Sequence, residues 1–141
     1  FWLALDRTTA DSGAMEFVRG SHDWDRWFQP ERFGKDAAGS SYDQNPDYEA
    51  IPDIEAARDD YEIIGWDLEP GDVYAFHAMT VHGAGGNMRQ DVRRRGLTIR
   101  YTGDDATYDP RTGTSPVMLD PNLKAGGPMD CDIYPVILPR A

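Results

Sequence analysis

The chain has 141 residues, of which 40% are apolar, and a formal charge of −11 from 25 acidic and 14 basic side chains. This length predicts one domain or a large part of one. The acidic balance excludes roles that depend on attraction to nucleic acid or anionic membranes, because phosphate groups would repel the protein. No stretch approaches the roughly 18 apolar residues that a membrane span requires.

The single cysteine, Cys131, excludes an internal disulfide framework and fits a reducing compartment, so we expect a cytoplasmic protein. Ten prolines and fourteen glycines indicate many turns and loops in place of long helices. The chain opens directly in strand-like sequence, Phe1-Trp2-Leu3. We therefore expect the sequence to be a piece whose N-terminal part is missing.

The first two predicted strands lie at the start of the chain. Residues 1–6 are short, apolar and aromatic, and residues 14–18 are a second apolar run. The connection between them is rich in turn residues, and its Gly13 can take a positive φ. We expect these two strands to pair as a hairpin that ends at Gly20-Ser21.

Residues 21–60 show neither a strand nor a helix period, apart from a possible short helix over residues 53–60. The segment still carries six aromatic residues: Trp24, Trp27, Phe28, Phe33, Tyr42 and Tyr48. A long loop inside a compact domain is usually functional or mobile. We interpret it as a lid-like insertion that is mobile and borders the substrate; an insertion without function is the alternative.

The remaining predicted elements are a strand over 61–67, a tight turn over 69–72, strand segments over 73–76 and 80–82 that could continue through His77, a turn over 83–91, a strand over 94–102 and an extended tail over 109–141. Short strands joined by turns indicate an all-β sandwich or barrel with minor helix.

Two features of the third quarter of the chain suggest a site for a metal and an organic acid. His82 is expected where strand gives way to a glycine-rich turn, so its imidazole, a common metal ligand, could face a cavity. Five arginines follow within twelve residues, and arginine binds carboxylates bidentately; they are Arg89, Arg93, Arg94, Arg95 and Arg100. A hydrogen-bonded structural histidine and charge balance against acidic residues 36–62 are the alternative readings.

The strings WLALD, SGAMEFVRGSH, FHAMTVHGAGGN and RRGL, in that order, resemble the phytanoyl-CoA dioxygenase family of non-haem Fe(II), 2-oxoglutarate-dependent oxygenases. The resemblance runs from the first residue to about Tyr108, with a weaker echo at residues 130–135. It implies a double-stranded β-helix, the cupin-like jelly roll. Residues 1–141 would then be a single domain, the C-terminal part of that fold, incomplete at its N-terminus.

The resemblance also implies roles for individual residues. His82 matches the distal iron-binding histidine, and His77 matches a position that does not ligate the metal. The family's His-x-Asp pair is absent, because His22 is followed two residues later by Trp24. We expect that pair, or a His-x-Glu pair, upstream of Phe1, and we expect residues 1–141 expressed alone to be insoluble or molten.

For the co-substrate, the resemblance assigns the carboxylate clamp to Arg94 and places Trp2 beside 2-oxoglutarate; a core aromatic is the alternative for Trp2. Strand alternation puts Arg94, Gly96 and Thr98 on one face, where Gly96 leaves room and Thr98 could add a hydroxyl contact. A slip of one residue would give the clamp to Arg93 or Arg95. We also expect His82 and Arg94 to point into one cavity.

The predicted function is hydroxylation of a small organic metabolite, with Fe(II), O₂ and 2-oxoglutarate as cofactor and co-substrates. The alternatives are a non-catalytic jelly-roll protein that binds a ligand or metal, and a related halogenase. We expect a monomer or homodimer whose partner is a small-molecule substrate.

Overall fold

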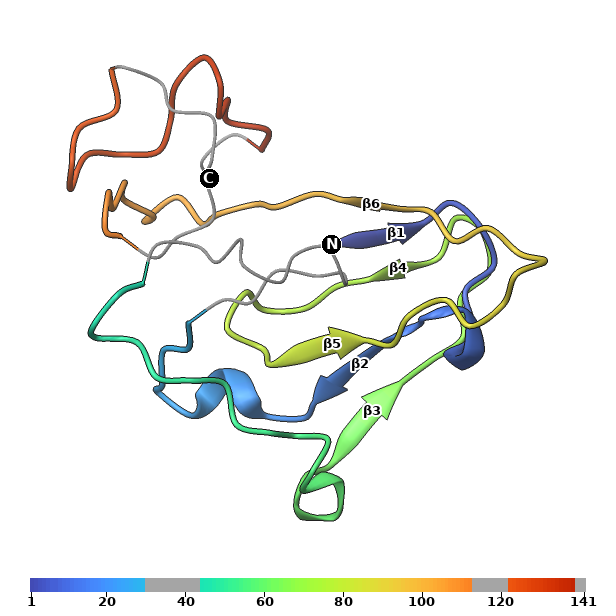
Figure 1. Cartoon of the computed structure of the whole chain (residues 1–141). Coiled ribbons are helices and arrows are strands. Elements are labelled where there is room, and N and C mark those ends of the chain that lie inside the picture. The colour runs from blue at the N-terminus through green and yellow to red at the C-terminus, as the bar shows by residue number, and fades with distance from the viewer. Residues whose placement is uncertain (30–43, 113–121, 139–141) are drawn as a thin grey trace. The chain divides into compact units, whose positions relative to one another are not determined.

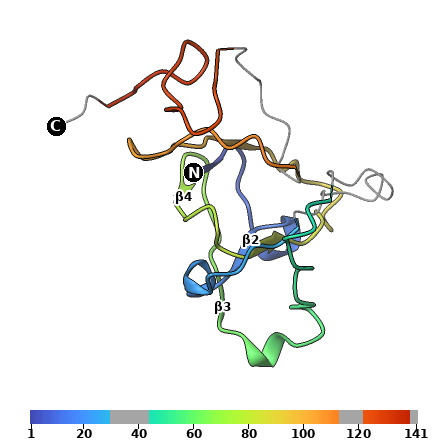
Figure 2. The same cartoon turned by 90° about the vertical axis from the view of Figure 1, so that its left-hand side faces the viewer.

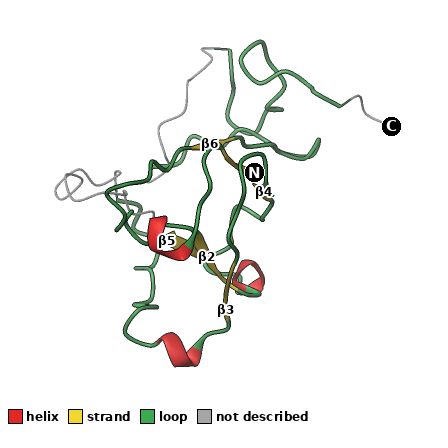
Figure 3. Cartoon of the chain, turned by 90° about the vertical axis from the view of Figure 1, so that its right-hand side faces the viewer, coloured by secondary structure: helices red, strands yellow, loops and turns green. Residues whose placement is uncertain are grey.

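The computed structural model describes residues 1–29, 44–112 and 122–138. They lie in two compact units, Phe1–Phe28 with Glu49–Arg100, and Gln29–Tyr48 with Tyr101–Ala141. The strands are β1 (Trp2–Ala4), β2 (Met15–Val18), β3 (Ile63–Gly65), β4 (Val73–Tyr74), β5 (His82–Ala84) and β6 (Gly96–Thr98). The helices are single 3-10 turns: η1 (Ala10–Ser12), η2 (Ser21–Asp23) and η4 (Arg58–Asp60) (Figure 3).

The first unit contains two small antiparallel sheets, with strand orders β4-β1-β6 and β3-β2-β5 (Figure 1). The described residues are therefore all-β with little helix, as the sequence predicts. In the first sheet Trp2 lies opposite Tyr74 on β4 and Thr98 on β6, and Ala4 lies opposite Gly96. In the second sheet Phe17 lies opposite Ile64 on β3 and His82 on β5.

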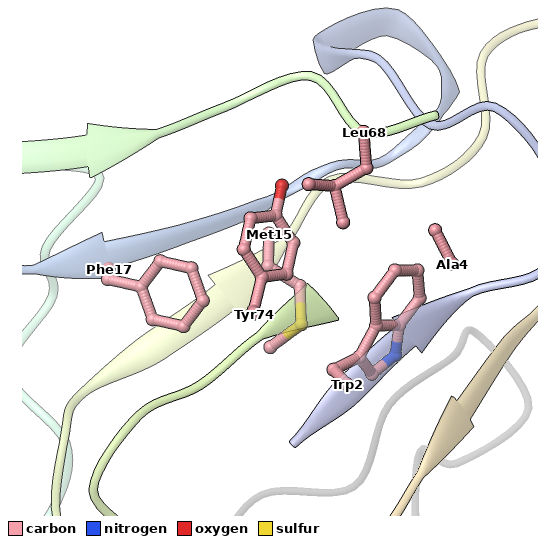
Figure 4. Packing of buried hydrophobic residues seen from close by; sticks show 6 residues of the cluster. All are labelled: Trp2, Ala4, Met15, Phe17, Leu68 and Tyr74. Carbon is pink, nitrogen blue, oxygen red and sulfur yellow. The ribbon is translucent and has the colours of Figure 1, made fainter. Parts of the chain in front are cut away.

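The core lies between the inner faces of these sheets. Trp2 and Ala4 point inward from β1, and Met15 and Phe17 point inward from β2, as the period-2 geometry of a strand requires. The buried cluster consists of Trp2, Ala4, Met15, Phe17, Leu68 and Tyr74 (Figure 4). Figure 4 shows the Trp2 and Phe17 rings on either side of Tyr74 and Met15. Aromatic side chains thus supply most of the core volume.

The prediction of a hairpin between residues 1–6 and 14–18 is wrong. β1 and β2 lie in different sheets, and among the described residues each pairs with strands that come later in the chain. Between them the backbone of buried Thr8 exchanges two hydrogen bonds of 2.8 Å with Leu68. Gly13 then turns the chain with φ +90°, as expected, beside Gly85. These long-range contacts carry the chain from one sheet to the other.

The strand segments on either side of His77 are also not continuous. β4 ends at Tyr74, and a turn closed by the Thr80 N–H and the His77 carbonyl (3.0 Å) leads to β5 in the other sheet. His82 therefore begins a strand, where the sequence indicated a strand end. The turn over 69–72 is as expected, with Gly71 at φ +100° and the Asp72 N–H bonded to the Glu69 carbonyl.

The described parts of residues 21–60 are held by side-chain contacts. Arg26 pairs with Glu49, and the Trp24 ring packs 6.1 Å from that of Tyr61. The helix expected over 53–60 is limited to η4. Residues 30–43, with Phe33 and Tyr42, lie outside the described residues, so the lid interpretation stays a prediction.

In the second unit, Tyr108 exchanges backbone hydrogen bonds of 2.8 Å with Gly126 and Gly127, and Thr107 forms an isolated bridge with Pro128. The described part of the tail beyond Asn122 consists of turns and bends, and Cys131 in it is a half-buried free thiol. Figure 2 shows this part of the chain in red as loops without strands. Across the described residues of both units, no helix is long and apolar enough to cross a membrane.

Candidate active site

His82 faces inward at the start of β5, opposite Phe17 on β2. Its Nδ1 lies 2.7 Å from the carbonyl oxygen of Thr80. Because a carbonyl can only accept a hydrogen bond, this contact places the imidazole proton on Nδ1. The lone pair of Nε2 is then available to a ligand, the arrangement that orients histidines in metal sites.

Two neighbouring aromatic rings pack against the His82 imidazole. The Phe76 ring centroid lies 4.8 Å from that of His82, and the Phe17 centroid lies 6.1 Å away. The side chain is half-buried. Its ring plane is therefore fixed by packing as well as by the hydrogen bond to Thr80.

Buried Ser21 positions the backbone just before His82, a role that sequence reasoning missed. Its hydroxyl donates to the Val18 carbonyl (2.7 Å) and accepts from the Val81 N–H (2.8 Å). The Val18 N–H in turn donates to the Val81 carbonyl. The sequence Gly-Ser-His signals this only as a strand break, because the partner, Val81, is sixty residues away.

Arg94 points inward just before β6 and stacks on Trp2. Its guanidinium carbon lies 4.7 Å from the Trp2 ring centroid, a cation–π distance. Burial lowers the pKa of Arg94 below its ordinary value, although arginine stays charged. Its Nε is buried and has no hydrogen-bond partner among the described residues. A buried donor without a partner is costly and is suited to an anionic ligand.

Arg93 and Arg95 face the other way and are held by Asp6. The Asp6 carboxylate accepts hydrogen bonds from the backbone N–H, Nε and one terminal nitrogen of Arg95, each 2.9 Å long. Arg93 lies 3.9 Å from the same carboxylate, with its side chain 71% exposed. The side-chain hydrogen bond from Arg95 is the main reason why the pKa of Asp6 lies below its ordinary 3.8. Asp6 thus fixes which arginine turns inward.

Trp2 occupies the space that Gly96 leaves. A Cβ added at Gly96 would lie 2.0 Å from Cζ2 of Trp2 and 2.3 Å from its Cε2. The room expected at Gly96 is therefore filled by indole. Thr98 lies directly opposite Trp2 on the same face but is exposed.

A continuous row of aromatic rings leads from Arg94 to His82. From Trp2, the ring centroid of Tyr74 is 5.8 Å away, that of Phe17 is 5.2 Å beyond Tyr74, and that of Phe76 is 4.9 Å beyond Phe17. Burial raises the pKa of Tyr74, whose hydroxyl donates to the Trp66 carbonyl. The row spans the two inner faces, so His82 and Arg94 stand at its ends.

The basic segment is mostly charge-balanced. Arg89 pairs with Asp11 and Asp91, and these contacts raise its pKa further. Together with the two contacts of Asp6, they leave Arg94 as the inward-facing cation of the segment. The carboxylates that balance the basic segment are those of Asp6, Asp11 and Asp91. Among the described residues, no ion pair links the five arginines to the region 36–62, so the expected charge balance against that region is not seen.

The described residues fit an organic anion better than a complete metal centre. The orphaned Nε of Arg94 fits a carboxylate. For iron, His82 is a suitable ligand, but no three His, Cys, Asp or Glu side chains among the described residues cluster closely enough to hold a metal ion. Holding Fe(II) therefore needs ligands in addition to those described.

A model of the family "Phytanoyl-CoA dioxygenase (PhyH)" matches residues 1–96, about two thirds of the chain. The chain belongs to the phytanoyl-CoA dioxygenase family. It is 32% identical over 94 residues to "Dioxygenase cdmD" of Talaromyces verruculosus, with 67% of this chain and 22% of that protein covered. It is 28% identical over 104 residues to a "Probable phytanoyl-CoA dioxygenase" of Caenorhabditis elegans, with coverage of 74% and 30%. "Dioxygenase aneA" of Aspergillus aculeatus is 31% identical over 108 residues, with coverage of 77% and 27%.

The chain thus spans between 22% and 30% of the length of these family relatives. No solved structure matches it. Strands β1 to β5, with His82, lie inside the region matched by the phytanoyl-CoA dioxygenase model, as does Arg94.

Proposed function

We propose that the native protein is an Fe(II)- and 2-oxoglutarate-dependent dioxygenase that hydroxylates a small organic metabolite. Membership of the phytanoyl-CoA dioxygenase family supports an oxygenase. The observation that carries the finer proposal is the presence of two inward side chains at the ends of the aromatic row: His82 with its Nδ1 on the Thr80 carbonyl, and Arg94 with a buried Nε that has no partner among the described residues.

We further propose that the two sheets are parts of a double-stranded β-helix. In support, the chain crosses from one sheet to the other between β1 and β2, between β4 and β5, and between β5 and β6. Among the described residues β5 pairs only with β2, and β6 only with β1. Each therefore has one free edge, where a further strand would satisfy its backbone groups. A strand beside β5 is the natural carrier of a His-x-Asp or His-x-Glu pair.

In this proposal Nε2 of His82 is one ligand to iron, and the additional ligands come from that neighbouring strand. Bound Fe(II) supplies the redox chemistry by which O₂, 2-oxoglutarate and a substrate C–H bond become succinate, CO₂ and a C–OH group. The chain's own residues orient the co-substrate and exclude water from the site. Arg94 binds the distal carboxylate, Trp2 holds the guanidinium in place, and Phe17 with Phe76 keeps the His82 ring dry.

The test is succinate release from 2-oxoglutarate by the native protein, with and without Fe(II) and O₂. His82→Ala should abolish it while the far-UV circular dichroism stays that of wild type, because a half-buried ligand contributes chemistry more than packing. Unchanged succinate release by the variant would rule out the assignment. Ligand binding without any succinate release in the wild type would instead favour a non-catalytic jelly-roll protein.

A chlorinated product in place of a hydroxylated one, formed when chloride is supplied, would identify a halogenase. The substrate is a small molecule, and the protein is proposed to act as a monomer or homodimer. A cytoplasmic location is proposed because residues 1–141 hold one cysteine, Cys131, and so form no disulfide among themselves.

A further inference from the structure

A pocket of about 460 Å³ lies in the first unit, beside the His82 ring but not lined by His82 or Arg94. This volume is within the range of small-molecule sites. Its apolar lining includes Phe17, Ile64, Trp66, Val73, Tyr74 and Phe76. The pocket therefore offers a hydrophobic molecule several aromatic faces.

The pocket and the His82 surroundings share residues. Phe17 and Phe76 line the pocket and also contact the His82 ring, and Thr80 lines the pocket while its carbonyl holds His82 Nδ1. A ligand seated there is separated from His82 by no more than this shared layer of side chains. The pocket is thus adjacent to the proposed reaction centre.

Two histidines that sequence reasoning left without a site meet at this pocket. The ring centroids of His22 and His77 lie 5.7 Å apart, and both residues line it. Nδ1 of His77 accepts the Met79 N–H at 3.2 Å, so in the neutral ring the proton is on Nε2. This N–H and the Thr80 hydroxyl are donors for an oxygen of the ligand.

The charge of the pocket is nearly neutral. Arg19 is the one cation among the described lining residues, and its guanidinium pairs with Glu62 at 2.6 Å. The chain as a whole carries −11. Neither property favours a polyanionic group such as the phosphates of coenzyme A.

We propose that this pocket binds the substrate, and that the substrate is an uncharged hydrophobic molecule with a hydrogen-bond-accepting oxygen, not a coenzyme A thioester. The role as substrate site rests on the proposed oxygenase function. The binding preference of the pocket does not rest on that function, and it is measured without iron or 2-oxoglutarate. A failure of the pocket proposal can therefore be distinguished from a failure of the oxygenase proposal.

The experiment titrates the uncharged dye Nile red into the native protein and follows its fluorescence. Two competitors carry the same octanoyl thioester, one on N-acetylcysteamine and one on coenzyme A. The uncharged thioester should displace the dye at a concentration at least tenfold lower than the coenzyme A thioester. Equal or stronger displacement by the coenzyme A thioester would overturn the substrate class.

The location is tested with Ala75→Phe, which adds a ring at a residue that lines the pocket, and with the control Ala78→Phe, three residues further on at a position that does not line it; both alanines are exposed. Ala75→Phe should weaken Nile red binding at least tenfold, and Ala78→Phe should leave it unchanged. Thermal melts establish that both variants are folded; if Ala75→Phe does not fold, Ala75→Leu is the second filling variant. Wild-type affinity in a folded filling variant, or no dye binding by the wild type, would overturn the proposal.

Discussion

Replacing Gly96 with alanine should expel or tilt the Trp2 indole. The added methyl would lie 2.0 Å from Cζ2, 2.3 Å from Cε2 and 2.8 Å from Nε1 of Trp2, all well inside van der Waals contact. The indole is 7% exposed and packs against Tyr74 and Arg94, so any movement of the ring disturbs these neighbours. Relief therefore requires a shift of β6 or loss of the indole from the core.

The expected loss in the free energy of unfolding of Gly96→Ala lies between the values typical of two known effects. Overpacking a well-packed core costs about 1–3 kcal/mol, and losing a buried tryptophan costs about 3–5 kcal/mol. Because the overlap is with ring atoms of a buried residue, we expect a loss of about 3 kcal/mol in the free energy of unfolding. Gly83→Ala on β5 is the matched control, since a Cβ there meets nothing within 4 Å. It should change stability by less than about 1 kcal/mol.

The assay is equilibrium urea unfolding of the native protein, followed by circular dichroism. A double-mutant cycle with Trp2→Ala isolates the clash, because Gly96→Ala should cost far less once the indole is gone. If Gly96→Ala costs no more than Gly83→Ala, or costs the same in both backgrounds, the packing of Trp2 on Gly96 is wrong.

Two further predictions concern the framework. Asp6→Asn should lower the urea midpoint at about pH 7, and the difference should vanish on acidification. The folded pKa of Asp6 is below 3.8, so its contribution is present above that value and is lost as pH falls through the folded pKa; a difference that persists in acid would contradict the ion-pair account. Phe17→Ala should cost about 3–5 kcal/mol in unfolding free energy, because Phe17 is 5% exposed, whereas Phe1→Ala, at a 50% exposed position, should cost much less. Equal costs would contradict the burial of Phe17 between the sheets.

The sequence predicts where strands lie better than it predicts which strands pair. Short apolar segments bounded by turn residues locate β1, β2, β3, β4 and β6 within the expected ranges. The prediction of a hairpin between β1 and β2 is wrong because the chain between them is held by backbone hydrogen bonds of Thr8 to Leu68, sixty residues away, which no local pattern shows. A turn-rich connection between two apolar runs has the same local signature whether the chain folds back or crosses to another sheet.

Strand geometry predicted that Arg94 faces away from Arg93 and Arg95, because side chains alternate with a period of two. The choice of Arg94 as the inward residue came from the family resemblance. The pocket could not be predicted from the sequence, because His22 and His77, which line it, are brought together by the fold. The space at Gly96 could be predicted, but its occupant, Trp2, could not. The roles of His82, Arg94, Trp2 and Thr98 toward iron and 2-oxoglutarate stay predictions.

One measurement tests the central claim, that His82 and Arg94 serve one metal and one co-substrate. It is the calorimetric titration of 2-oxoglutarate into the native protein loaded with Mn(II), a redox-inert substitute for Fe(II). We predict that His82→Ala removes metal-dependent binding, that Arg94→Met weakens it by about 10- to 100-fold, the value of a charged hydrogen bond, and that Arg93→Met binds like wild type. Metal-dependent binding retained by His82→Ala, or a loss in Arg93→Met that Arg94→Met does not show, would contradict the account.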